Sequence, residues 1–378
     1  MTSNHSSRKH QTPKERLPLF SIILLGLAAL SFLLVVIARH SVAFATFFNR
    51  RISSVVRAIL AHATNLFPFS TAELLILLIP VILLILIILA VRIGANSWKS
   101  VLIYTISLIS IASMIFTIFV FAYGIGYYVP TLDKQLELDS RPVSAEELKE
   151  TALWLAEELK KFDDEFRTFA DGSTAMPYSL HEMSEKLMLS YREISSQHPF
   201  LQSLKSRIKP VLFSIAMSET HFTGVYTFFT GEANLNVDFP DYTLPYTAAH
   251  EFAHQRGIAR ENEANFIAFL VCTASDDPYL QYSGYLNLYE YVASALYSAS
   301  RDLYYEVYAT VPAYAKQEMR AYSAFYEQYR ESEAGKVGSS INNAFLQANG
   351  TVEGTKSYGL VVDLAVAYYR TVVNTEPS

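Results

Sequence analysis

The sequence predicts a mainly α-helical membrane protein whose soluble part contains a small β-sheet. Three observations lead to this class: long apolar segments near the N-terminus, a change in the sign of the charge after residue 130, and helical patterns in most later segments. Hydrophobic residues make up 51% of the 378 residues, which is on the high side. We therefore expect a membrane domain at residues 1–130 and a soluble domain at residues 131–378.

Three segments, residues 18–38, 74–91 and 101–129, are apolar enough and long enough to cross a bilayer. A helix of about 20 residues spans a hydrocarbon core of about 30 Å. The first segment is too long for the apolar part of a signal peptide, and no clean cleavage pattern follows it. We expect all three segments to be retained as transmembrane helices.

The loop at residues 50–62 is expected to form an amphipathic helix. One helical face carries apolar side chains: Ile52, Val55, Val56, Ile59 and Leu60. Such a helix can lie at the membrane interface, or it can pack on the soluble domain. The sequence leaves both arrangements open.

The charges divide at the same boundary. Residues 1–130 have a net charge of +8, and residues 131–378 have a net charge of −14. An acidic soluble domain argues against nucleic acid or an anionic membrane surface as its partner. The tail and second loop carry slightly more basic residues than the first loop, which favours a cytoplasmic tail and an extracytoplasmic soluble domain. The single cysteine excludes an intrachain disulfide.

Helices are expected to dominate the soluble domain. Ser144 and Glu147 have the spacing of a capping box, which marks the start of a helix. The segments VLFSIAM (211–217) and GVYTFFTGEANLNVDFP (224–240) are rich in β-branched and aromatic residues, and we expect short strands there. The other expected helices are at residues 181–196, 200–209, 247–256, 261–273, 283–309, 313–333 and 359–371.

The segment TAAHEFAHQRGIARENEANFIAFLVC (247–272) contains the strongest candidate for a functional site. His250 and His254 are four residues apart, so a helix places both imidazoles on one face, as two ligands of one metal ion need. Glu251 then lies beside the open coordination position, where it can take a proton from a metal-activated water. The alternative is a helix that merely carries polar residues. Gly257 argues against it, because it can end this helix and turn the chain back toward further acids.

A catalytic zinc site usually has three protein ligands, and two histidines with one glutamate form a known set. Glu261 shares its helical face with the small residues Ala264 and Ala268, so this face can approach the first helix closely. We prefer Glu261 as the third ligand, although Glu263 remains open as the alternative. Asn265, one turn after Glu261, can hydrogen-bond the far nitrogen of a ligand histidine. Cys272 is expected to be buried packing.

Several segments resemble the domain of unknown function 3810 family of bacterial membrane proteins. They are GVYTFFTGEANLN (224–236), PYTAAHEFAHQRGIARENEANFIAFLVC (245–272), YSGYL (282–286), FPFSTAELL (67–75) and GTKSYGLVVDLAVAYYR (354–370). The similarity extends from the membrane region almost to the C-terminus. This family implies no substrate.

A wider resemblance is to zinc metallopeptidases of the gluzincin type. It implies a zincin-like domain at residues 131–378, with His250, His254 and Glu261 as zinc ligands and Glu251 as the general base. It also implies that the strand at residues 225–237 can pair with an extended peptide substrate. The chain departs from the gluzincin pattern in its short gap between His254 and Glu261, and in having Asn265 where many such enzymes have aspartate.

The expected function is that of a membrane-anchored zinc metallopeptidase. The alternative is a zinc-binding sensor or assembly factor without catalysis. An intramembrane protease is disfavoured, because Arg256, Arg260 and the nearby acids would be too costly in lipid. Tyr358 is a weak candidate for stabilising an oxyanion.

Overall fold

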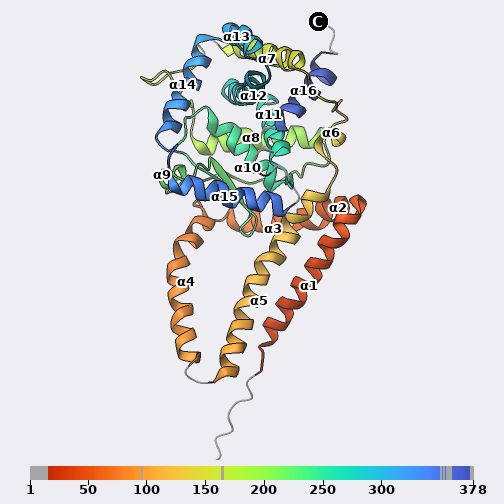
Figure 1. Ribbon diagram of the computed structural model, residues 1–378, viewed down its shortest axis with the longest axis vertical. Helices are drawn as coiled ribbons and strands as arrows, with labels where there is room; N and C mark the ends of the chain where they lie inside the picture. Colours follow the sequence, from red (N-terminus) through yellow and green to blue (C-terminus); the bar gives the residue numbers. More distant parts are fainter. Residues whose placement is uncertain are drawn as a thin grey trace, which may run out of the picture.

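The computed structural model describes residues 16–94, 97–162, 166–349, 351, 354 and 360–374. Three long apolar helices extend from one side of a mostly helical domain, which is called the soluble body below (Figure 1). The small sheet and the segment 247–272 lie nearer to these apolar helices than to the far end of the soluble body (Figure 1).

The three apolar helices are α1 (Leu19–His40), α4 (Thr71–Gly94) and α5 (Trp98–Ala122). Each is long and apolar enough to cross a membrane. Helices α1 and α5 pack side by side, whereas α4 stands apart along most of its length (Figure 1). These helices agree in number and position with the three predicted apolar segments.

The predicted end of the third segment, at residue 129, is wrong. Helix α5 ends at Ala122, and a 3-10 helix, η2 (Gly124–Tyr128), follows it. Gly124 and Gly126 interrupt the α-helix, because glycine is a poor helix former. The chain there enters the soluble body, where Tyr123 and Tyr127 are buried.

The loop between α1 and α4 forms α2 (Val42–Phe47), a π-helical turn (Phe48–Ser53) and α3 (Ser54–Thr64). One side of α3 packs on the soluble domain, where the buried Arg57 donates to Gln202 and to the carbonyl oxygen of Ala122. The other side exposes apolar residues, with Val55 55% and Ile59 63% exposed. The structure therefore confirms packing on the domain and leaves an apolar face outward.

Helices of the soluble body surround a core formed by α10 (Thr243–Gln255), α11 (Glu261–Thr273) and α12 (Pro278–Ala299). The predicted capping box is present, with Ser144 and Glu147 at the start of α7. The remaining helices are α6 (Leu132–Gln135), α7 (Ala145–Leu159), η3 (Lys160–Phe162), α8 (Leu180–Gln197), α9 (Ser214–Ser218), α13 (Arg301–Thr310), α14 (Ala313–Glu327), α15 (Glu333–Ala348), α16 (Val361–Tyr368) and a π-helical turn (Tyr369–Val373).

The sheet has three short strands in the order β1 (Lys209–Pro210), β3 (Glu232–Leu235) and β2 (Gly224–Thr227). Strands β2 and β3 form an antiparallel hairpin, and β1 runs parallel to β3. Gly231 has a φ of +71°, so it suits the turn of the hairpin. The predicted strand segment at 224–240 is confirmed in this hairpin.

Two carboxylates join the sheet region to helix α4. Glu232 on β3 accepts hydrogen bonds from the backbone N–H groups of Thr71 and Ala72, and thus caps the first turn of α4. In return, Glu73 in α4 accepts from the backbone N–H groups of Leu212 and Phe213. The apolar helix and the soluble domain are therefore coupled by charge-assisted hydrogen bonds.

Three predictions about the soluble domain are wrong. Residues 200–209 are not helical: residues 202–208 have no regular secondary structure, and the carbonyl oxygen of Leu204 accepts a hydrogen bond from Arg256 instead of from a helical N–H group. The segment 211–217 is not a strand: it contains a turn and most of α9, and Leu212 is 81% exposed. The predicted helix 283–309 is two helices, which Ser300 separates by capping the start of α13.

Candidate metal centre

The site lies between two antiparallel helices, α10 and α11, that the turn 256–260 connects. Gly257 has a φ of +97°, a conformation that suits glycine and lets the chain reverse within five residues. The backbone N–H of Gly257 also bonds to the carbonyl oxygen of His254, which closes the end of α10. The turn that the sequence predicted is present, and it brings the start of α11 beside the histidines.

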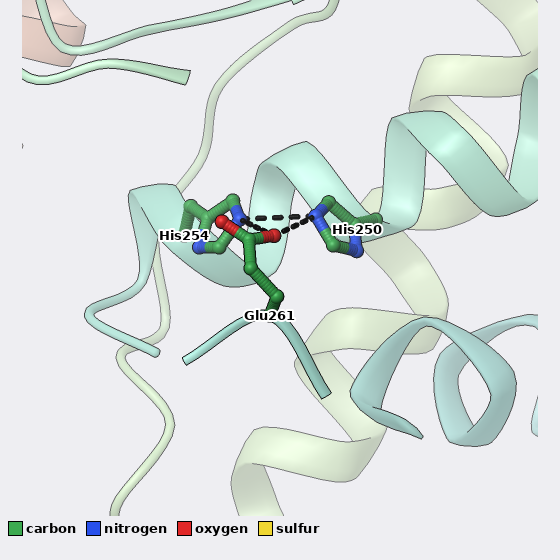
Figure 2. A group of neighbouring side chains, drawn as sticks. All are labelled: His250, His254 and Glu261. Atoms are coloured by element: carbon green, nitrogen blue, oxygen red, sulfur yellow. Dashed lines mark hydrogen bonds and ion pairs between the residues drawn. The ribbon is translucent and has the colours of Figure 1, made fainter. Parts of the chain in front are cut away.

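His250, His254 and Glu261 meet at one point, as Figure 2 shows. The Nε2 atoms of the two histidines are 3.0 Å apart. One carboxylate oxygen of Glu261, Oε2, lies 3.1 Å from the His250 nitrogen and 3.2 Å from the His254 nitrogen. Ligands at about 2.0–2.1 Å from a tetrahedral ion lie about 3.3 Å apart, so this triangle has the size of one face of such a site.

The other ring nitrogens are held by oxygen acceptors. Nδ1 of His250 lies 2.7 Å from Oδ1 of Asn265, and Nδ1 of His254 lies 2.7 Å from the carbonyl oxygen of Ile258. Each acceptor favours a proton on Nδ1, which leaves the lone pair of Nε2 free to bind a metal ion. Two nitrogen lone pairs and a carboxylate oxygen then converge in a buried place, an arrangement that a cation would stabilise.

The pKa values of Glu261 and His254 are both shifted far from their usual ranges. Burial alone would raise the pKa of Glu261, but the two nearby histidines lower it far below its usual range. Burial opposes protonation of His254, yet the carboxylate of Glu261 raises its pKa to about 9. Both shifts arise from the attraction between the Glu261 carboxylate and a proton on the histidines, and a bound cation would take the place of that proton.

Glu251 lies beside strand β2, next to Gly224. Its Oε2 is buried and has no hydrogen-bond partner among the described residues. A Cβ added to Gly224 would lie 2.6 Å from Oε1 of Glu251, so the strand's glycine makes room for the carboxylate. Burial raises the pKa of Glu251 to about 7, although both histidines and the backbone N–H of Tyr226 lower it.

Glu263 does not reach the histidines. Its Oε1 accepts from Arg260 at 2.8 Å and from the backbone N–H of Leu132 at 2.9 Å. These contacts tie α11 to the start of α6, on the side away from the triangle. Of the two glutamates that the sequence left open, the structure brings Glu261 to the histidines.

Tyr123 is a site residue that the sequence analysis missed. Its hydroxyl lies 3.0 Å from Nδ1 of His254 and donates to the carbonyl oxygen of Ala259 at 3.1 Å. Its ring packs edge to face with the His254 ring at a centroid distance of 5.9 Å. The glycines of AYGIGYY, which interrupt the apolar segment, were the signal that the chain leaves the helix here.

A polar cleft of about 630 Å³ adjoins the site, and both His250 and Glu251 line it. Its other walls come from the loop before β2 and from helices α12, α14 and α15. Hydroxyl and amide groups predominate in the lining: Thr220, Thr223, Thr243, Thr247, Asn265, Asn287, Ser294, Ser323, Ser339 and Asn342. The cleft is large enough to hold a few residues of a polar chain next to Glu251.

Three further predictions concerned the single residues Cys272, Asn265 and Tyr358. Cys272 is a free, fully buried cysteine inside α11, which confirms its assignment as packing. Asn265 makes the predicted hydrogen bond to a histidine of the cluster. Tyr358, the candidate for an oxyanion contact, lies outside the described residues.

Comparison with known proteins identified a family for this chain. The family model described as "Protein of unknown function (DUF3810)" matches residues 48–366, which is well over half of the chain. No curated protein and no solved structure matches the chain. The matched range includes the helices α10 and α11 and the strands that surround the cluster.

Proposed function

We propose that this chain, which belongs to the DUF3810 family, is a membrane-anchored zinc-dependent metallopeptidase. The observation that carries the proposal is the convergence of His250, His254 and Glu261 beside a cleft that Glu251 also lines, with the Oε2 of Glu251 lacking a hydrogen-bond partner among the described residues. Two imidazole nitrogens and one carboxylate oxygen are a donor set typical of catalytic zinc. Zinc at such a site supplies Lewis-acid chemistry.

The proposed ligands are His250, His254 and Glu261. Asn265 and the Ile258 carbonyl hold the two imidazoles in the tautomer that presents Nε2. Because the spacing of the three donor atoms fits one face of a tetrahedron, a bound ion would take its fourth ligand from water or substrate.

Glu251 is the proposed general base. It is the residue after His250, it lines the cleft, and its Oε2 has no hydrogen-bond partner among the described residues. A pKa raised to about 7 by burial suits a group that takes a proton near neutral pH and then donates it to a leaving amine.

Strand β2 is the proposed contact for a peptide substrate. It is an edge strand of the three-stranded sheet, and its Gly224 touches the carboxylate of Glu251. An extended peptide added to this edge would lie next to the proposed base. Such pairing uses backbone hydrogen bonds, so it supports a peptide as the substrate class.

The membrane anchor is the remaining part of the proposal. Three helices of sufficient length and apolarity extend from the same side of the soluble domain (Figure 1). In the proposed topology the N-terminal tail is cytoplasmic and the domain with the cluster is extracytoplasmic.

The decisive experiment measures zinc and peptide turnover on the full chain purified in detergent. We expect about one zinc per chain, its loss in the His250→Ala/His254→Ala double variant, and cleavage of quenched fluorescent peptides. Glu251→Gln should keep the zinc and lose roughly 10²–10⁴-fold in turnover. Absence of zinc in the wild-type chain would refute the proposal. Retained zinc with no peptide cleavage would favour a non-catalytic sensor or assembly factor.

A further inference from the structure

Helix α15 lies across the base of the soluble body, on the side from which the apolar helices extend (Figure 1). The sequence analysis assigned no element to most of this segment. Its 16 residues fall into three faces when they are placed at 100° per residue. One face is buried against the domain, one is polar, and one is apolar and exposed.

The buried face brings α15 close to the loop before β2. Gly335 and Gly338 are both buried, and a Cβ on Gly338 would lie 3.0 Å from the carbonyl oxygen of Thr220. Leu346 completes this face and is fully buried. From the same helix, Ser339 and Asn342 line the cleft that contains Glu251. Helix α15 is therefore a wall of the proposed active site.

The exposed apolar face carries Val337, Ile341 and Phe345, which are spaced four residues apart and so form one stripe. Val337 is 57% and Ile341 65% exposed. Alanines at 334, 344 and 348 widen the stripe. Nothing in the described residues covers the two large side chains, and removal of their apolar surface from water would stabilise the protein.

The stripe is continuous with the end of a proposed membrane span. The ring of Phe345 packs edge to face on Phe119, which lies in the last turn of α5, at a centroid distance of 5.9 Å. Leu212 and Phe213, 81% and 53% exposed, are fixed near the start of α4 by Glu73. Exposed apolar side chains thus gather where two of the proposed spans meet the soluble body.

We propose that α15 lies in the interface of the bilayer, with Val337, Ile341 and Phe345 facing the lipid. An amphipathic helix of this kind buries its apolar face about 5–10 Å into the boundary between headgroups and acyl chains. The proposal rests on the membrane anchorage proposed above and adds a new partner for a helix outside the spans. Because the same helix lines the cleft, the bilayer supports one wall of the proposed active site.

A consequence for substrate follows from this placement. The cleft lies on the opposite side of α15 from the lipid, so about the diameter of one helix, roughly 10 Å, separates it from the face that enters the bilayer. We infer that the substrates are polypeptide segments held close to the membrane surface. A segment of a membrane protein just outside its own span fits this requirement.

The test places a nitrobenzoxadiazole fluorophore at single cysteines in the full chain, reconstituted into phosphatidylcholine vesicles that contain a nitroxide-labelled lipid. The quencher lies near the headgroup for positions 341 and 336, and deep in the acyl chain for position 32, which is inside the proposed span. Cys272 is fully buried, so Ile341→Cys provides the accessible thiol. Lys336→Cys, five residues away on the polar face, is the matched control. Phe32→Cys, 64% exposed on α1, reports whether the spans themselves are in the bilayer.

We expect blue-shifted emission and strong quenching at positions 341 and 32, and neither at 336. Emission at 341 that resembles emission in water, with quenching at 32, overturns the proposal while the membrane anchor stands. A blue shift at 341 without quenching also overturns it, and points to a protein partner on the stripe. Absence of quenching at 32 would instead refute the anchor. Circular dichroism of each labelled variant checks that the fold is retained.

Discussion

The hydroxyl of Tyr123 lies 3.0 Å from Nδ1 of His254, although 131 residues separate the two in the chain. Tyr123 follows the last residue of the apolar helix α5, and His254 belongs to the candidate metal centre. The end of a proposed membrane span is therefore in direct contact with a proposed zinc ligand.

Removal of the Tyr123 hydroxyl should weaken zinc binding without abolishing it. Groups that hold the far side of a ligand histidine typically contribute 10–100-fold to metal affinity. His254 keeps its bond to the Ile258 carbonyl, so we expect Tyr123→Phe to lose about tenfold, at the lower end of this range. Competition with a zinc chelator measures the change. Tyr128→Phe, which removes a hydroxyl bonded to Arg39 instead, should leave affinity unchanged.

Glu261→Gln and Glu263→Gln form a matched pair within one helical turn. The first removes the carboxylate that faces both histidines, and the second removes one that faces Arg260 and Leu132. We expect zinc content, measured by mass spectrometry of the purified chain, to collapse in Glu261→Gln and to persist in Glu263→Gln. The reverse pattern would assign the third ligand to Glu263.

Gly224→Ala tests the position of the proposed base through its neighbour. The new Cβ would lie 2.6 Å from Oε1 of Glu251, so the carboxylate must move. A displacement of about 1 Å can cost about 10²-fold in rate, and we expect a loss of this order in kcat/KM with zinc retained. Gly26→Ala, whose Cβ would meet nothing within 4 Å, is the control. Unchanged turnover in Gly224→Ala would argue against Glu251 as the base.

Glu318 should make the protein less stable as the pH rises. It is fully buried, accepts from the backbone N–H of Thr174, and its pKa is raised by burial to about 7. The folded state therefore keeps a proton that the unfolded chain releases at about pH 4.3. The contribution of Glu318 to the free energy of unfolding is greatest below this pH, and it falls by about 3 kcal/mol as the pH rises to about 7.

Thermal unfolding at a series of pH values measures this effect. In Glu318→Gln the fall in midpoint between about pH 5 and 8 should be smaller than in the wild type, because the titrating group is gone. Glu327→Gln, an exposed glutamate in the same helix, should keep the wild-type slope. Parallel curves for wild type and Glu318→Gln would contradict the prediction.

The candidate site was largely predictable because its parts are local in sequence. The spacing of His250 and His254, Gly257 at the turn, and the small residues on the face of Glu261 together describe two helices that fold back on each other. Each of these signals acts within 20 residues. The preference for Glu261 over Glu263 followed from side-chain size, and the structure brings Glu261 to the histidines.

Long-range features could not be predicted in the same way. Tyr123 looked like part of an apolar span, and its partner His254 is remote in sequence. Helix α15 was missed because Gly335 and Gly338 lower helix propensity, whereas in the structure they allow close packing. Strand β1 has two residues, too few for a period-2 pattern to show.

The cap that Glu232 forms on α4 has a consequence for biogenesis. Thr71 emerges from the ribosome 161 residues before Glu232, so the proposed span α4 is synthesised while the N–H groups of its first turn are not yet satisfied by this carboxylate. Only when the β2–β3 hairpin has folded can the cap form. Nascent chains that stop before residue 232 should therefore hold α4 less firmly in register than complete chains, and folding of the domain should fix that helix last.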